Sequence, residues 1–99
     1  MNGLQIQSLG DDRFLLSGDL HFDNVPQIWE QSRAMFTGAP GLTLDLAGIT
    51  RTDSAGLALL IEWMRLARES HKPIAFKNVP AQMQALIEAS GLTEVLPLS

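Results

Sequence analysis

Apolar and polar side chains alternate strictly in several short segments of this chain. In the clearest of them, Leu42, Leu44 and Leu46 alternate with Thr43 and Asp45. A period of two predicts a β-strand that turns one face to the core and the other to water. A strand buried on both faces would be apolar throughout, so the polar positions indicate a sheet that helices cover on one side only.

Three other segments show the same alternation and enlarge the predicted sheet. Residues 4–8 and 13–17 are separated by a turn signal at 10–12, so together they predict a hairpin. Residues 74–77 predict a further strand, and a short terminal strand is expected at 94–96. The sheet should therefore contain four or five strands.

Three segments with helical periodicity separate or follow these strands. The first begins after a cap at Asp23 or Asn24 and ends before Gly38. The other two cover approximately residues 54–70 and 80–90. Strands that are joined through a helix are expected to run parallel, with right-handed crossovers.

The size of the chain allows one hydrophobic core. A sequence of 99 residues, 45% of them hydrophobic, cannot supply two. We therefore expect one α/β domain over residues 1–99, with a mixed four- to five-stranded sheet and helices mainly on one face. Cysteine is absent, so no disulfide framework is available and the cytosol is the expected compartment.

Charge and hydropathy narrow the classes of partner. Seven basic and eleven acidic side chains give a net charge of −4, and the basic residues are scattered. Nucleic acid requires a basic surface and an anionic membrane requires a polybasic run, so neither is an expected partner. No uncharged run approaches the roughly 20 apolar residues of a membrane-spanning helix. The basic start of a leader peptide is also missing, and we expect a protein that stays inside the cell.

The most informative segment is Asp53-Ser54-Ala55-Gly56, where a predicted strand passes into a predicted helix. A side-chain oxygen of Asp53 or Ser54 can accept a bond from an unpaired N–H of the first helical turn, and capping alone is the ordinary interpretation. Glycine in a helix costs about 1 kcal/mol relative to alanine, and Gly56 is explained if another backbone comes close to this turn. An exposed serine here is also suited to carry a phosphate, because the helix N-terminus favours negative charge.

The helix predicted from Ser54 carries more apolar residues than one core-facing stripe requires. The core stripe comprises Leu57, Leu60, Ile61, Met64 and Ala67. A second apolar stripe is formed by Leu59, Trp63 and Leu66. Two interpretations are open: a neighbouring helix buries this second stripe, or it stays exposed and Trp63 anchors a partner.

The segment 53–57, Asp-Ser-Ala-Gly-Leu, is followed by Ala58-Leu59-Leu60 and preceded by Leu44-Asp45-Leu46. This pattern resembles the signature of STAS domains, the family of bacterial anti-sigma factor antagonists. Gly18-Asp19-Leu20 resembles the family's turn before the first helix and Gly91-Leu92 its ending, so the resemblance covers nearly the whole chain. It implies a STAS-like fold and a protein that acts by binding another protein.

Within the family, the chain is most similar to the compact form that serves Gram-negative phospholipid ABC transporters. The similar features are Pro26 and Trp29 in the first helix, Arg51 before the motif, and the tail Val95-Leu96-Pro97. This similarity implies a cytoplasmic, non-catalytic subunit, peripheral on the inner-membrane transporter, that binds and supports the ATPase subunit. The antagonist branch implies instead a regulator whose kinase partner phosphorylates Ser54.

Under both interpretations, the candidate partner-binding residues lie on the helix that begins at Ser54. Ser54 is the candidate contact or phosphate acceptor, and the other candidates are Thr52, Asp53, Ala55, Gly56, Leu59 and Trp63. No catalytic residue, metal or cofactor is predicted. A nucleophilic serine needs a base, but nothing places His21 or His71 beside it, and His71 lies at the far end of the same helix, about 25 Å away. No second pair of metal ligands accompanies His21, and no phosphate-binding glycine motif is present.

Overall fold

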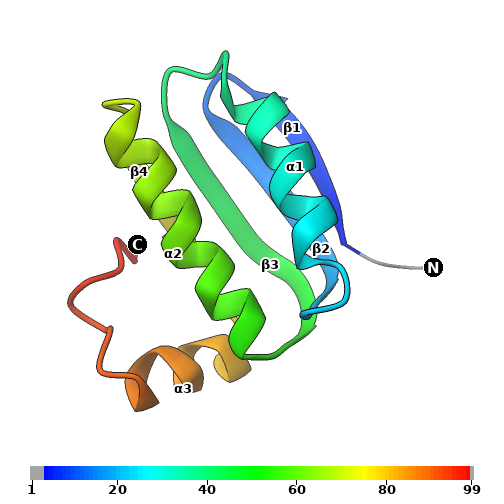
Figure 1. Ribbon diagram of the computed structural model, residues 1–99, viewed down its shortest axis with the longest axis vertical. Coiled ribbons are helices and arrows are strands. Elements are labelled where there is room, and N and C mark those ends of the chain that lie inside the picture. The colour runs from blue at the N-terminus through cyan, green and yellow to red at the C-terminus, as the bar shows by residue number, and fades with distance from the viewer. Residues whose placement is uncertain (1–3, 99) are drawn as a thin grey trace.

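The computed structural model describes residues 4–98 as a four-stranded sheet with three helices (Figure 1). The elements in chain order are β1 (Gln5–Gly10), β2 (Arg13–Leu20), α1 (Val25–Phe36), β3 (Leu42–Thr52), α2 (Ser54–Glu69), β4 (Ile74–Lys77) and α3 (Ala81–Ala89). The strand order is β1-β2-β3-β4, with β1 antiparallel to β2 and the other neighbours parallel. The predicted hairpin, mixed sheet and parallel strands are confirmed.

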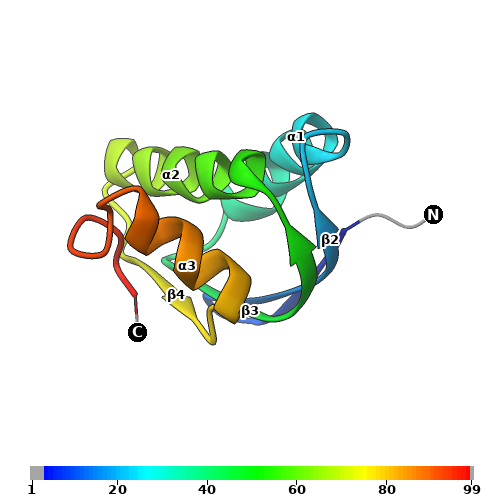
Figure 2. The ribbon, with the colours of Figure 1, turned by 90° about the horizontal axis from the view of Figure 1, so that it is seen from below.

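The helices lie on one side of the sheet, with α1 and α2 side by side over the same face and α3 beside α2 (Figures 1 and 2). The face beneath them is apolar and buried, and its side chains include Phe14, Leu16, Leu44, Leu46 and Phe76. The opposite face carries polar side chains that are exposed or half-buried, among them Gln5, Gln7, Arg13, Thr43, Asp45 and Lys77. The prediction that helices cover only one face of the sheet is therefore confirmed.

Strand β3 is longer than the alternation predicts, because a bulge changes the period after Leu46. Two residues of β3 oppose one residue of β2 between the paired positions Leu15–Asp45 and Ser17–Gly48. A Cβ atom at Gly48 would lie 2.7 Å from the carbonyl oxygen of Leu16, so glycine permits the close approach of the two strands here. Beyond the bulge the strand continues to Thr52 and delivers the chain directly to Ser54.

The fifth strand predicted at 94–96 is wrong. The carbonyl oxygen of Leu92 accepts hydrogen bonds from the N–H groups of Val95 and Leu96, at 3.0 and 3.1 Å, which closes this segment into a turn. The chain reaches β4 only afterwards, through an isolated parallel bridge between Phe76 and Leu98. An apolar residue of this segment, Leu96, is part of the buried core, although the segment is not an extended strand.

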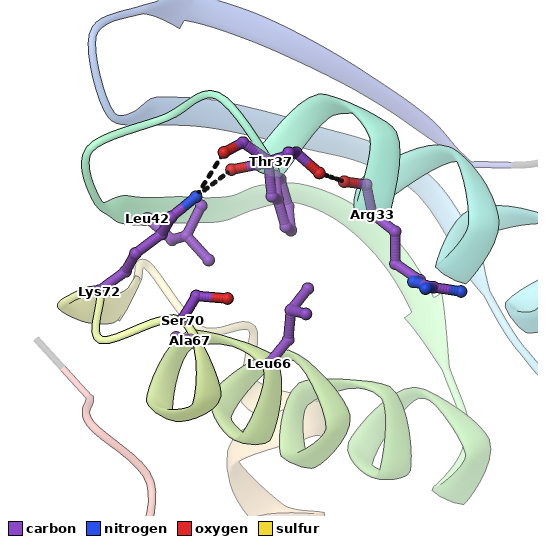
Figure 3. Close-up of a pocket in the computed structure, with 8 residues that line it drawn as sticks. Arg33, Thr37, Leu42, Leu66, Ala67, Ser70 and Lys72 are labelled. Carbon is purple, nitrogen blue, oxygen red and sulfur yellow. Dashed lines mark hydrogen bonds between the residues drawn. The ribbon is translucent and has the colours of Figure 1, made fainter.

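A lysine closes the C-terminal end of α1, next to a cavity of about 230 Å³ between the ends of α1 and α2 (Figure 3). Lys72 Nζ donates hydrogen bonds to the carbonyl oxygens of Phe36 and Thr37, at 2.6 and 2.9 Å. Both carbonyls lie at the end of the helix, where that of Phe36 also accepts from the N–H of Ala39 at 3.1 Å, and the positive charge suits the negative end of the helix dipole. The cation at this cavity therefore serves the fold.

Candidate functional site

Ser54 opens α2 at the point where β3 ends, and its side chain is exposed. The cap of this helix is Asp53, whose Oδ1 accepts a hydrogen bond from the N–H of Ala55 at 2.9 Å. The carbonyl oxygen of Asp53 also accepts from Gly56 and Leu57, at 3.0 and 3.4 Å. The aspartate thus satisfies the first turn, and the hydroxyl of Ser54 is not needed as the cap.

The second carboxylate oxygen of Asp53 ties the start of α2 to the loop before α1. It accepts a hydrogen bond from the N–H of Phe22 at 3.3 Å, and the side chain of Phe22 is 70% exposed. Asn24 holds the same loop, since its Oδ1 accepts from the N–H of His21 and its Nδ2 donates to the carbonyl oxygen of Asp19. Both polar atoms of the Asn24 side chain therefore bond within this loop, and Asn24 makes no side-chain cap for α1.

Gly56 and Thr52 lie inside the molecule, which corrects their assignment as partner contacts. A Cβ atom at Gly56 would overlap Thr52 Oγ1 and lie 3.2 Å from Leu20 Cγ. The atoms that crowd this glycine are therefore side chains of the same chain, at the ends of β3 and β2. Thr52 is buried, and its N–H donates to Gln82 Oε1 at 2.9 Å, so α3 also holds the segment that leads to Ser54.

Trp63 and Leu59 are buried, so a neighbouring helix covers the second stripe and neither side chain projects as an anchor for a partner. Trp63 is 0% exposed and Leu59 is 2% exposed. The indole Nε1–H of Trp63 donates to Ser32 Oγ at 2.8 Å, and its ring packs edge-on against Phe36 with centroids 5.8 Å apart. The physical reason is that α1 lies beside α2 on the same face of the sheet and covers this stripe. Of the seven candidates, Ser54 is exposed, and Asp53 and Ala55 are half-buried.

A shallow apolar groove between α1 and α2 was missed from the sequence. It measures about 270 Å³ and is lined by Val25, Pro26, Trp29, Ala58, Leu59 and Glu62. We call these six residues the α1–α2 groove. Ser54, Ala58 and Glu62 are four residues apart and therefore form one row along α2, and the first turns of both helices lie at the same end of the molecule (Figure 1). In the sequence, the spacing of four between Ser54, Ala58 and Glu62 was the pattern that could have indicated this groove.

A polar depression of about 250 Å³ adjoins the start of α2. It is lined by Asp19, His21, Arg51, Thr52 and Asp53. His21 therefore lies closer to the Ser54 turn than the sequence indicated, and its Nδ1 accepts from the N–H of Asp23 at 3.3 Å. Within residues 4–98, no group of three His, Asp or Glu side chains is arranged to hold a metal ion. In the same range, no helix combines the length and apolar character needed to cross a bilayer.

Comparisons with known proteins bear on this arrangement. The family model described as "Mlab, STAS domain" matches residues 6–97. The intermembrane phospholipid transport system binding protein MlaB of Escherichia coli (strain K12) is 30% identical over 87 residues, which cover 87% of this chain and 88% of that protein. MlaB of Shigella flexneri matches to the same extent.

Solved structures of low sequence identity share the fold. An anti-sigma factor antagonist from Mycobacterium paratuberculosis has a TM-score of 0.75 and 20% identity, covering 99% of this chain and 85% of its own. The phosphorylated form of the Bacillus cell fate determinant SpoIIAA has a TM-score of 0.71 and 21% identity, covering 98% and 91%. The family match and the MlaB relatives show that the chain belongs to the STAS domain family, in the group that the MlaB model describes.

Proposed function

We propose that this protein is a cytoplasmic, non-catalytic subunit of a Mla-type phospholipid ABC transporter. It binds the ATPase subunit through Ser54 and the α1–α2 groove. The MlaB relatives are named as binding proteins of a phospholipid transport system, which supports the transporter assignment. The observation that carries the proposed surface is the exposure of Ser54 at one end of an apolar groove that the fold leaves open.

The chemistry of the surface suits a protein partner. Ala58 gives α2 a small, exposed side chain one turn after Ser54, so another chain can approach the helix closely. Pro26 and Trp29 supply apolar surface on the facing helix, and tryptophan is among the residue types enriched at binding hot spots. Phe22 extends the apolar surface beyond the first turns. Exposed apolar side chains gathered in this way are typical of an interface.

The experiment is calorimetric titration of the purified ATPase subunit from the same organism. Ser54→Glu should raise Kd by about tenfold or more, because its longer side chain holds the partner away from the first turn of α2 and from the groove beside it. The matched control is Ala85→Glu, which adds the same charge at an exposed position of α3, away from the groove. An affinity that Ser54→Glu leaves unchanged, or that both variants lower equally, contradicts the proposal.

One observation favours a second candidate function. The hydroxyl of Ser54 is exposed at a helix N-terminus and is not consumed by capping, so a kinase could reach it. The protein would then be an anti-sigma factor antagonist switched by phosphorylation. Intact-mass measurement of protein purified from its native cell separates the two, because phosphorylation adds about 80 Da and Ser54→Ala would abolish that species.

A further inference from the structure

We infer that the segment docking on the α1–α2 groove presents a large apolar side chain flanked by lysine or arginine. This inference rests on the proposed function, which places the partner on this surface. It adds the chemical character of the partner, which neither the family nor the relatives' names supply. The argument comes from the charges that border the groove.

Two exposed carboxylates flank the groove without a firm cation partner. Asp23, two residues before the groove-lining Val25, has a 72% exposed side chain, and its ionisable neighbour is His21, whose Nδ1 lies 3.9 Å away. Glu62, on α2, lines the groove itself, and its side chain is 44% exposed. Its ion pair with Arg65 spans 3.6 Å between exposed groups, and the attraction within such exposed pairs is weak. Both carboxylates remain available to a partner's cations.

The adjoining polar depression has the same sign of charge. Asp19 and Asp53 line it, with Arg51 as the cation of that depression. The basic side chains of the two helices, Arg33, Arg65 and Arg68, all lie in the C-terminal halves of α1 and α2, away from Ser54. Arg33 stacks over the ring of Trp29 at 5.8 Å, and Arg65 pairs with Glu62. The end of the molecule that carries Ser54 is therefore negative on balance, in keeping with the net charge of −4.

This charge pattern selects among occupants of the groove. A second copy of the chain, docked through the same surface, would bring carboxylates toward carboxylates, which is unfavourable. An anionic lipid surface would be repelled for the same reason. A protein segment that fills the groove with an apolar side chain and sets cations opposite Asp23 and Glu62 satisfies both the apolar floor and the charged border.

The test measures association and dissociation rates of the ATPase subunit on the immobilised protein, at about 50 and about 300 mM salt, since salt shortens the range of electrostatic attraction. The variant is Asp23→Asn combined with Glu62→Gln. The matched control is Glu88→Gln combined with Glu94→Gln, which removes the same charge from α3 and the turn after it, on the other side of α2 (Figure 1). Thermal melts verify that both variants fold.

The expected result is a wild-type association rate that falls steeply with salt. The groove variant should associate about threefold or more slowly at low salt and lose most of this salt dependence, while the control variant behaves as wild type. Binding that is insensitive to salt, or equal losses in both variants, overturns the basic-partner inference but leaves the proposed function standing. Absence of binding to the ATPase subunit at both salt concentrations overturns the proposed function and this inference with it.

Discussion

The burial of Trp63 can be tested through its hydrogen bond to Ser32. The indole N–H has no access to water and donates to Ser32 Oγ at 2.8 Å, and that hydroxyl in turn donates to the carbonyl oxygen of Trp29 at 2.9 Å. Ser32→Ala leaves the buried N–H without an acceptor, which costs about 1–3 kcal/mol. For a domain of this size, 1 kcal/mol lowers Tm by about 4–8 °C, so a loss of about 2 kcal/mol should lower Tm by about 8–16 °C.

A double-mutant cycle with Trp63→Phe isolates this interaction. Phenylalanine has no N–H, so in that background Ser32→Ala orphans nothing, and its helix-propensity effect is the same as in wild type and cancels. We expect a coupling free energy of about 1–2 kcal/mol from chemical denaturation of the four proteins. The partner-anchor interpretation of Trp63 requires no such coupling. A coupling below about 0.5 kcal/mol, the usual scatter of additivity, would refute the burial argument.

Three further substitutions test the construction of the site and its support. Gly56→Ala forces a Cβ onto Thr52 Oγ1, and despite the better helix propensity of alanine it should destabilise the fold by about 1–3 kcal/mol, read from denaturant midpoints. Asp53→Ala removes the cap to Ala55 and should cost about 1 kcal/mol, whereas Asp53→Asn, which keeps an acceptor, should recover most of the loss in the same assay. Lys72→Met removes the charged donor from the end of α1 and should lower stability by about 1 kcal/mol at low salt. If high salt does not shrink that difference, the charge contribution is refuted.

The architecture was predictable because the polar alternates were informative. A strand with one solvent-facing side carries a polar residue at every second position, as Thr43 and Asp45 show in β3. The prediction stopped at Leu46 because the bulge at Gly48 breaks the period while the strand continues. The terminal turn could not be predicted for a related reason. Residues 94–96 combine polar and apolar side chains as a strand does, and only the tertiary structure shows that Leu96 is apolar because it packs into the core.

The site was predictable in its position but not in its division into surface and core. Helical periodicity showed that Leu59 and Trp63 face away from the sheet, but it contains no information on where α1 lies. The placement of α1 beside α2 decides that Trp63 is core and that Ala58 borders a groove. Likewise, Gly56 indicated a close approach by another backbone, whereas the atoms that come close are the side chains of Thr52 and Leu20 in the same chain.

The neighbours of Ser54 make the contacts that stabilise the start of α2, and Ser54 itself contributes little to the fold. Asp53 caps the helix, while Gly56 and Thr52 fit together beneath the first turn. Ser54→Ala should therefore change the free energy of unfolding by less than about 0.5 kcal/mol, as for an ordinary surface position, while a contact through the hydroxyl would still be lost. Affinity for the ATPase subunit should fall in Ser54→Ala and be retained in Ser54→Thr, which keeps the hydroxyl. A Ser54→Ala variant that loses stability by about 1 kcal/mol would mean that the hydroxyl shares in capping, and binding changes at this position could then not be separated from the fold.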